Sequence, residues 1–202
     1  LKKARGAQAR HPGTDADGHR TCVQSTGELS ALYSQARIAQ PQFEREMQRL
    51  VAQFGSLPLG KNGQPQVKLS PGPLKHLYRC IEKMCLKEGE NRYAAESVCD
   101  MVRCIVECAD CKLMSRVLAA LMEWPGLTVV RVKDRANQLT SMMWMDVMVN
   151  VALANDPNTH VCEIQIVHHK MLVARSELGG HVPYARIRAA AEILEVRASM
   201  PP

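Results

Sequence analysis

Two acidic side chains, Asp100 and Glu163, stand in largely apolar runs that the sequence predicts to be β-strands. A carboxylate within such a strand is costly to bury unless a cation meets it. Two acids on neighbouring strands could hold Mg²⁺, which takes one or two protein carboxylates together with phosphate oxygens of a substrate. Metal-assisted phosphoryl transfer is then one interpretation. Edge positions, or salt bridges to Arg103 or Arg131, would explain both acids equally well.

The segment WMDVMVNVAL, residues 144–153, is predicted to be a strand with two different faces. Successive side chains of a strand point to opposite sides of the sheet. One face would mix aromatic and polar groups, as the floor of a binding site does: Trp144, Asp146, Met148 and Asn150. The other face is apolar and would pack on a core: Met145, Val147, Val149, Val151 and Leu153.

The segment HVCEIQIV, residues 160–167, follows the turn residues NDPN and is predicted to form an antiparallel hairpin with the strand before it. Glu163 and Gln165 share one face of this second strand with Val161. The alternate face is apolar: Cys162, Ile164 and Ile166. Because the strand is largely apolar, we expect it at the centre of the sheet.

The remaining elements follow from hydrophobic periodicity and from Gly and Pro breakers. Apolar residues at helical spacing predict an amphipathic helix over residues 29–54, and the Gly- and Pro-rich residues 55–73 predict a loop. A β-branched run predicts a strand over residues 98–107, on which Asp100 would lie. The other predicted elements are a helix through Leu74, Leu77, Ile81 and Met84, a helix through Leu113, Val117 and Leu121, a strand over residues 127–133 and one or two helices over residues 168–197.

This order of elements predicts an α/β (α+β) fold, a small mixed β-sheet flanked by helices. The 202 residues suffice for one domain with a real core. We expect that domain over residues 27–198, after a mobile basic segment over residues 1–26. On the second predicted helix, Lys75, Arg79 and Lys83 stand at i, i+4 and i+8, a pattern typical of a solvated face.

The composition limits the classes of partner. A formal net charge of +6 favours polyanions, either nucleotides or nucleic acid, although a basic protein without such a partner is the alternative. Aromatic residues make up only 4% of the chain, which argues against a base-stacking platform for single strands. No apolar run approaches the ~20 residues that span a bilayer, so we expect no membrane helix.

Eight cysteines could indicate zinc or disulfides. Cys108 and Cys111 form a CxxC pair, but zinc sites usually present two such pairs. Cys99 and Cys104 lie instead in the predicted strand and would point to opposite faces. Buried free thiols explain the pattern better, and they predict an intracellular, reducing compartment, either the cytoplasm or an organelle.

Five segments occur in the order, and at about the spacing, of the synthetase domain of RelA/SpoT-type alarmone synthetases, members of the nucleotidyltransferase superfamily: CDMVR, RVKDR, WMDVMVNV, HVCEIQI and GGHVPY. The resemblance covers about residues 66–190. Residues 131–134, RVKD, resemble the family's basic RxKD motif, and residues 163–166, EIQI, resemble its ExQxR strand. The sequence is most similar to the divergent, mostly eukaryotic branch of the family.

The resemblance implies a reaction in which the ribose 3′-hydroxyl of GDP or GTP attacks ATP and takes its pyrophosphate. Asp100 stands where the family binds Mg²⁺, and Glu163 stands where it activates the hydroxyl, so both acids are candidate metal ligands. The resemblance also implies substrate-binding residues: Arg131, Lys133, Lys75 and Arg79 for phosphates, Trp144 for stacking on a purine, and Gln165, Asn150 and His181. For His181, a structural role tying a helix to the sheet is the alternative.

The chain also departs from the family at the expected substrate loop. Residues 141–143, SMM, and Trp144 replace a glycine followed by a tyrosine, and only the glycine permits positive φ and close approach to a ligand. Met148 stands where the family has a histidine, and methionine makes no strong hydrogen bond. Val167 and His168 replace an Arg-Thr pair, which removes a phosphate contact.

Two hypotheses of different class follow. The first is a Mg²⁺-dependent nucleotide pyrophosphokinase that uses ATP as donor and GDP, GTP or a related acceptor. The second is a catalytically inactive module that holds a nucleotide, RNA or another domain of a larger multidomain protein. The retained Asp100, Glu163 and RVKD motif favour the first hypothesis, and the altered loop and the missing histidine favour the second.

Overall fold

A computed structural model describes residues 22–60, 63–85, 93–137, 144–176 and 190 of the 202-residue chain. Helices and strands are mixed in the order that the α/β (α+β) prediction requires, and that fold class is confirmed. The elements are α1 (Leu29–Ala52), β1 (Val67–Pro71), α2 (Leu77–Cys85), the short 3₁₀ helix η2 (Ala95–Ser97), β2 (Arg103–Cys108), α3 (Cys111–Met122), β3 (Leu127–Asp134), β4 (Val147–Leu153), β5 (Val161–His168) and α4 (His169–Ser176).

The five strands form one mixed sheet in the order β1-β2-β5-β4-β3. Strands β2 and β5 run parallel, and the other neighbouring pairs are antiparallel. The hairpin of β4 and β5 is confirmed, and so is the central position of β5. A central strand donates and accepts hydrogen bonds on both sides, so residues 163–166 of β5, Glu163 among them, are paired with both neighbouring strands.

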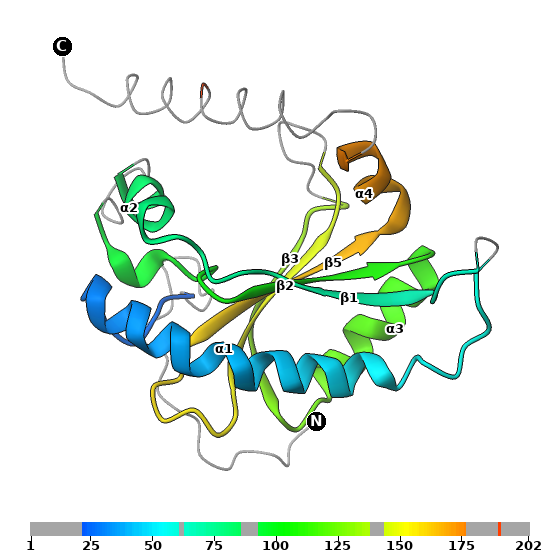
Figure 1. The fold of residues 1–202 in the computed structure, drawn as a ribbon, viewed down its shortest axis with the longest axis horizontal. Helices are drawn as coiled ribbons and strands as arrows, with labels where there is room; N and C mark the ends of the chain where they lie inside the picture. Colours follow the sequence, from blue (N-terminus) through cyan, green and yellow to red (C-terminus); the bar gives the residue numbers. More distant parts are fainter. Residues whose placement is uncertain (1–21, 61–62, 86–92, 138–143, 177–189, 191–202) are drawn as a thin grey trace.

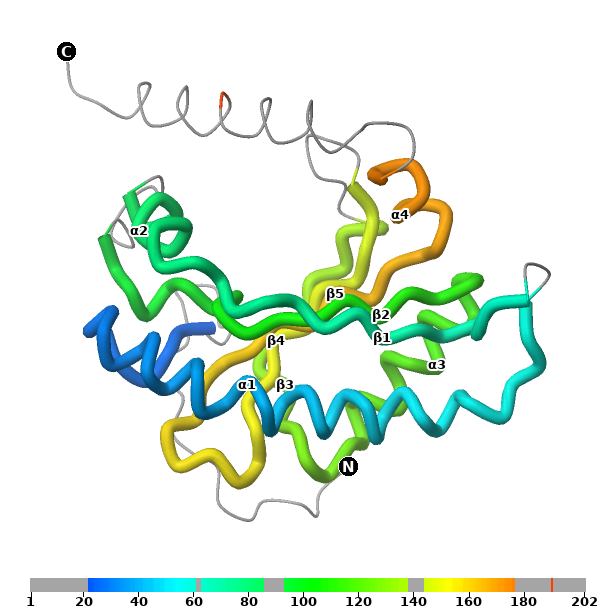
Figure 2. Tube along the Cα trace, viewed as in Figure 1, coloured from blue at the N-terminus to red at the C-terminus, as the bar shows by residue number. Residues whose placement is uncertain are grey.

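The two faces of the sheet have different coverings (Figure 1). Helices α1 and α3 lie on one face, and the trace in Figure 2 shows α2 and α4 above the other face, at opposite ends. The core lies on the α1 and α3 side, where the fully buried Phe43 and Met47 of α1 belong to the same cluster as Ile164 and Ile166 of β5. The second face is left with its polar side chains between α2 and α4.

Two predicted boundaries differ from the structure on the N-terminal side of β2. The predicted loop over residues 55–73 contains the edge strand β1, whose last residue is Pro71. Proline donates no ladder hydrogen bond and is tolerated at such an edge. The many Gly and Pro residues of this segment therefore predicted a loop where the structure has a strand. Helix α2 begins only at Leu77, so Lys75 precedes the helix and is buried rather than part of a solvated stripe.

Two further strands begin later than predicted. Strand β2 starts at Arg103, which places Asp100 in the segment before the strand rather than on it. Strand β4 starts at Val147, so Trp144 and Asp146 also lie before their strand. Residues 98–102 before β2 are buried without pairing as a regular strand, whereas before β4 Asp146 is buried and Met145 is exposed.

Residues 22–26 belong to the packed body, whereas the expected domain began at residue 27. Gln24 is buried, and its backbone N–H donates to the carbonyl of Glu96 (2.7 Å). The Gln24 side chain donates to the carbonyls of Val98 (3.1 Å) and Val161 (3.0 Å) and accepts from the Val161 N–H (2.8 Å). Gln24 thereby joins the segment before α1 to the start of β5.

Among the described helices, none has the length and apolar character required to cross a bilayer.

We expect Gln24→Ala to lower the free energy of unfolding by ~3 kcal/mol, at about 1 kcal/mol for each lost side-chain hydrogen bond. Chemical denaturation measures this change. Gln48→Ala, at an exposed position of α1, is the matched control and should change stability by less than ~0.5 kcal/mol. Equal effects of the two substitutions would show that the segment before α1 does not contribute to the packed body.

Candidate active site

The polar face of the sheet carries a row of directly paired residues, here called the first row. The register pairs Glu163 of β5 with Arg103 of β2 on one side and with Asn150 of β4 on the other. Asn150 in turn pairs with Arg131 of β3. Directly paired residues on neighbouring strands place their side chains on the same face. Glu163 is therefore held near the centre of the sheet, with an arginine at each end of its row.

A second row lies two residues further along the strands. It crosses all five strands, because β1 also contributes a residue: Ser70, Ile105, Gln165, Met148 and Lys133. Gln165 links the two rows, since its side-chain amide donates to Oε1 of Glu163 at 2.7 Å. The prediction that Glu163 and Gln165 share a face is confirmed.

A cavity of about 840 Å³ lies against these rows. Every residue of the second row lines it, as do Arg103, Glu163 and Arg131 of the first row. Helix α2 adds Lys83 and helix α4 adds Arg175, so the cavity lies between the two helices that stand over this face (Figure 1). Its charged lining has six cations and two acids: Lys83, Arg103, Arg131, Lys133, Arg135 and Arg175, with Asp100 and Glu163. This excess of positive charge suits a polyanionic ligand.

Asp100 is buried between two lysines. Its Oδ2 lies 2.6 Å from Lys75 Nζ, and its Oδ1 lies 3.0 Å from Lys83 Nζ. The Lys75 backbone N–H donates to the carbonyl of Met101 (2.9 Å), which holds this lysine beside the acid. Burial acts to raise the pKa of Asp100, but the charges of Lys83 and Lys75 outweigh it and hold the pKa well below its usual value. Asp100 is therefore an anion over the whole physiological range.

Glu163 has the opposite electrostatic environment. Burial raises the pKa of Glu163 above its usual value, and the nearby negative charge of Asp100 raises it further. The hydrogen bond from Gln165 only partly offsets these effects. Two carboxylates that face the same cavity thus differ in proton affinity, with Glu163 the better base of the two.

Asn150 is completely buried and does not line the cavity. Its Oδ1 accepts from Nε (3.1 Å) and Nη2 (2.8 Å) of Arg131, while its amide nitrogen donates to the carbonyls of Cys99 (3.3 Å) and Cys162 (3.4 Å). Asn150 therefore fixes the direction of the Arg131 guanidinium and ties the backbone before Asp100 to the sheet. It is a positioning residue for Arg131, and its role in substrate binding stays a prediction.

A further buried acid, Asp146, organises the wall of the cavity. Arg135 binds it through two nitrogen–oxygen contacts of 2.5 and 2.6 Å, and the indole of Trp144 donates to Oδ2 at 2.9 Å. The guanidinium carbon of Arg175 lies 5.3 Å from the centre of the Trp144 ring, within the range of a cation–π contact. Trp144 is thus fixed at its edge by Asp146 and faced by a cation from α4.

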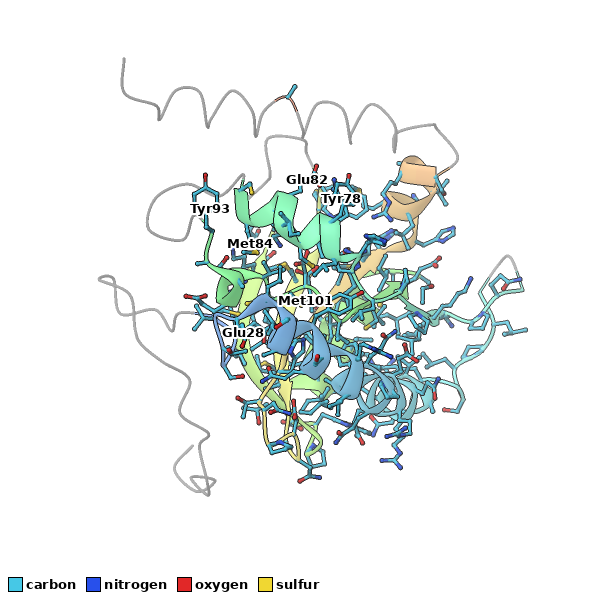
Figure 3. All side chains as sticks on the ribbon, turned by 60° about the vertical axis from the view of Figure 1, so that its left-hand side comes forward. Glu28, Tyr78, Glu82, Met84, Tyr93 and Met101 are labelled. Atoms are coloured by element: carbon cyan, nitrogen blue, oxygen red, sulfur yellow. The ribbon has the colours of Figure 1, made fainter. Side chains whose placement is uncertain are left out.

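The structure brings together five of the predicted functional residues as well as Asp100: Arg131, Lys133, Trp144, Glu163 and Gln165 line the cavity. It does not place Lys75 or Arg79 in that lining. Lys75 is engaged with Asp100, and Arg79 pairs with Glu82 one turn further along α2. Figure 3 shows Tyr78 and Glu82 on this helix. His181 and the loop residues 141–143 lie outside the described residues.

Sequence reasoning missed Arg135 and Arg175, and treated Lys83 as part of a solvated stripe. A signal existed for Arg135, since Arg131, Lys133 and Arg135 alternate and must share one face of an extended segment. Burial lowers the pKa of Lys133, and the charges of these two arginines lower it further. An anion in the cavity would relieve this crowding of cations. No sequence pattern identified Arg175.

Comparison with known proteins rests on structure, because no family model matches the sequence and no curated protein matches it. Small alarmone synthetase 1 of Bacillus subtilis, bound to its product pppGpp, superimposes with a TM-score of 0.60 at 14% identity, covering 82% of this chain and 86% of that one. The chain has the alarmone synthetase fold. The same synthetase bound to AMPCPP gives a TM-score of 0.54 at 14% identity, with 84% and 89% of the two chains covered.

Two further proteins have this alarmone synthetase fold. Small alarmone synthetase 2 of Bacillus subtilis matches with a TM-score of 0.58 at 15% identity, over 86% of this chain and 83% of that one. A GTP pyrophosphokinase family protein of Streptococcus pneumoniae matches with a TM-score of 0.55 at 16% identity, over 80% and 81%. The fold expected from the RelA/SpoT resemblance is confirmed.

Whether the site suits Mg²⁺ can be judged from its donors. Among the described residues no group of three or more His, Cys, Asp or Glu side chains could hold a metal ion, so the described lining of the cavity offers two carboxylates. That number suffices when phosphate oxygens complete the coordination shell. Oδ1 of Asp100 is buried and makes no hydrogen bond, although the ammonium of Lys83 lies 3.0 Å away. The donor set therefore fits Mg²⁺, with Lys83 as a competitor at Asp100.

The ion pair of Lys75 and Asp100 should show strong energetic coupling. We expect Asp100→Asn to lower the free energy of unfolding by ~3 kcal/mol, because it leaves the buried Lys75 ammonium without its counter-ion. The double variant Lys75→Met/Asp100→Asn should lose less free energy of unfolding than the two single variants lose in sum, and the difference should be ~1–3 kcal/mol.

Chemical denaturation of the four proteins in this cycle measures the coupling. Lys83→Met serves as the control, because its side chain is 38% exposed and solvent screens its interaction with Asp100. Its loss should be below ~1 kcal/mol. Strict additivity of Lys75→Met and Asp100→Asn would contradict the pairing.

Proposed function

We propose that this domain binds ATP and a guanine nucleotide in the cavity and transfers pyrophosphate from ATP to the 3′-hydroxyl of the acceptor. The observation that supports this most is the placing of Glu163, a buried carboxylate of raised pKa, among six cavity-lining cations. The cations would bind the phosphates of the nucleotides, and Glu163 would act as a general base next to these phosphates. The pppGpp and AMPCPP complexes of a synthetase with the same fold agree with such ligands.

In this proposal Glu163 takes the proton of the acceptor 3′-hydroxyl. The hydroxyl oxygen forms a bond to the β-phosphorus of ATP, and the bond between that phosphorus and the bridging oxygen to the α-phosphate breaks, so AMP leaves with the bridging oxygen. Gln165 orients the carboxylate through its 2.7 Å hydrogen bond. Arg131, fixed by Asn150, and Lys133 bind the phosphate oxygens.

Mg²⁺ is the metal proposed for this site, with Asp100 as one ligand and Glu163 as the second carboxylate beside it. A bound Mg²⁺ would neutralise charge on the polyphosphate. Because both oxygens of Asp100 face lysines, this chain can also supply cations of its own to the same region. Trp144 offers an aromatic face to a purine, and Arg175 lies over its ring.

Binding without transfer is the second candidate function. The arrangement of Asp100 favours it, since Lys75 and Lys83 each lie within 3.0 Å of one of its oxygens and would have to yield to a metal. Met148 favours it too, because this thioether occupies the second row where a side chain with a strong hydrogen bond would help to orient a substrate. In that case the cavity would retain a nucleotide, or a segment of RNA, for a larger protein.

An assay with labelled ATP, Mg²⁺ and each of GDP, GTP and tRNA as acceptor separates the two candidates. We expect label transfer to a guanine nucleotide, with a loss of ~10²–10⁴-fold in Glu163→Gln, the range for removal of a general base. This substitution keeps the shape of the side chain and an oxygen that can accept from Gln165.

Glu123→Gln removes the same charge at an exposed position beyond the end of α3 and should transfer label at the wild-type rate. Calorimetry on the same samples measures the binding of ATP and completes the test. Nucleotide binding with no transfer to any acceptor would contradict the enzyme and support the binding module. Absence of both nucleotide binding and label transfer would contradict both candidate functions.

A further inference from the structure

Two cysteines that are far apart in the sequence meet in the wall of the cavity. Cys22 lies before α1 and Cys99 lies directly before Asp100, 77 positions along the chain. The Cys99 thiol donates to the backbone carbonyl of Cys22 at 3.3 Å, and the two thiols lie within hydrogen-bonding reach of each other. Both residues belong to one small buried cluster, together with Val130, Ala152 and Val161.

The surroundings hold both cysteines in place. The neighbouring Gln24 is anchored through its side chain to Val98 and Val161. The carbonyl of Cys99 accepts from the buried Asn150 amide at 3.3 Å. These hydrogen bonds hold the backbone around both cysteines, so folding has already brought the two distant chain segments together.

Both residues are buried but line the cavity, so a small reagent in the cavity meets this part of its wall. Cys104 also lines the cavity, whereas Cys22 and Cys99 lie there as a contacting pair. Arg131 and Lys133 line the same cavity as the two cysteines. Nearby cations favour the thiolate, which is the form of cysteine that reacts with oxidants.

We propose that Cys22 and Cys99 form a reversible disulfide in the cavity wall, a modification site that does not depend on the proposed transferase activity. The oxidant is a peroxide of the class of hydrogen peroxide. Formation of the disulfide would join the segment before α1 covalently to the residue before Asp100, and so would fix one wall of the cavity.

The chemistry balances in two steps. The Cys22 sulfur attacks one oxygen of hydrogen peroxide, the O–O bond breaks, and the second oxygen leaves as water, which gives a sulfenic acid at Cys22. The Cys99 sulfur then attacks the Cys22 sulfur and expels the sulfenic oxygen as a second water. Overall, two thiols and one peroxide give one disulfide and two waters.

Peptide mapping of the folded protein tests the site directly. After treatment with one equivalent of hydrogen peroxide and alkylation of the remaining thiols, trypsin should release peptides 21–37 and 93–103 joined by a disulfide. Each of these peptides contains one cysteine, so the joined mass identifies the pair without ambiguity. Dithiothreitol should separate them and restore both thiols.

The exposed Cys111 provides an internal control for the reactivity of a thiol outside the cavity wall. Its peptide, 104–112, should remain unlinked to peptides 21–37 and 93–103. Cys22→Ser and Cys99→Ser should each abolish the joined mass. Recovery of peptides 21–37 and 93–103 as separate alkylated or over-oxidised species, or linkage of either one to another cysteine peptide, would overturn the proposal.

Discussion

The burial of Glu163 in the central strand is the constraint on which the rest of this structure depends. The strand β5 is apolar on its core face, and its hydrogen bonds on both sides prevent it from moving its acid to an edge. A buried carboxylate must find cations or hydrogen-bond donors, or else take up a proton. The fold supplies all three responses, through the hydrogen bond from Gln165, the positive charges of Lys83 and Arg135, and a raised pKa.

The same constraint explains why the helices cover the two faces of the sheet in different ways. Helices α1 and α3 pack on the apolar face and complete the core (Figure 1). On the other face α2 and α4 stand at opposite ends and contribute Lys83 and Arg175 to the space between them. Asp100 could be accommodated there only with its own counter-ions, and its two lysines come from the segment before α2 and from α2 itself.

Local patterns predicted the parts of the site that lie on regular strands. The alternation of side chains in residues 160–167 placed Glu163 and Gln165 together, and the turn before them predicted the hairpin. The same rule failed at Asp100 and Trp144, because each lies just outside the ladder, where period-two reasoning no longer applies. The partners of Asp100 were inaccessible to pattern reasoning, since Lys75 and Lys83 reach it only through tertiary packing. The edge strand β1 was hidden by its proline and glycine neighbours.

The central claim, that polyphosphate binds over the two rows, is tested most directly by NMR of protein labelled at its methionine methyl groups. Met148 lies in the second row and lines the cavity, whereas Met47 is fully buried in the core on the opposite face. With the two resonances assigned by Met148→Leu and Met47→Leu, titration with ATP should shift the Met148 methyl signal and leave that of Met47 unchanged. Saturable ATP binding that leaves the Met148 signal unmoved would contradict this account of the site.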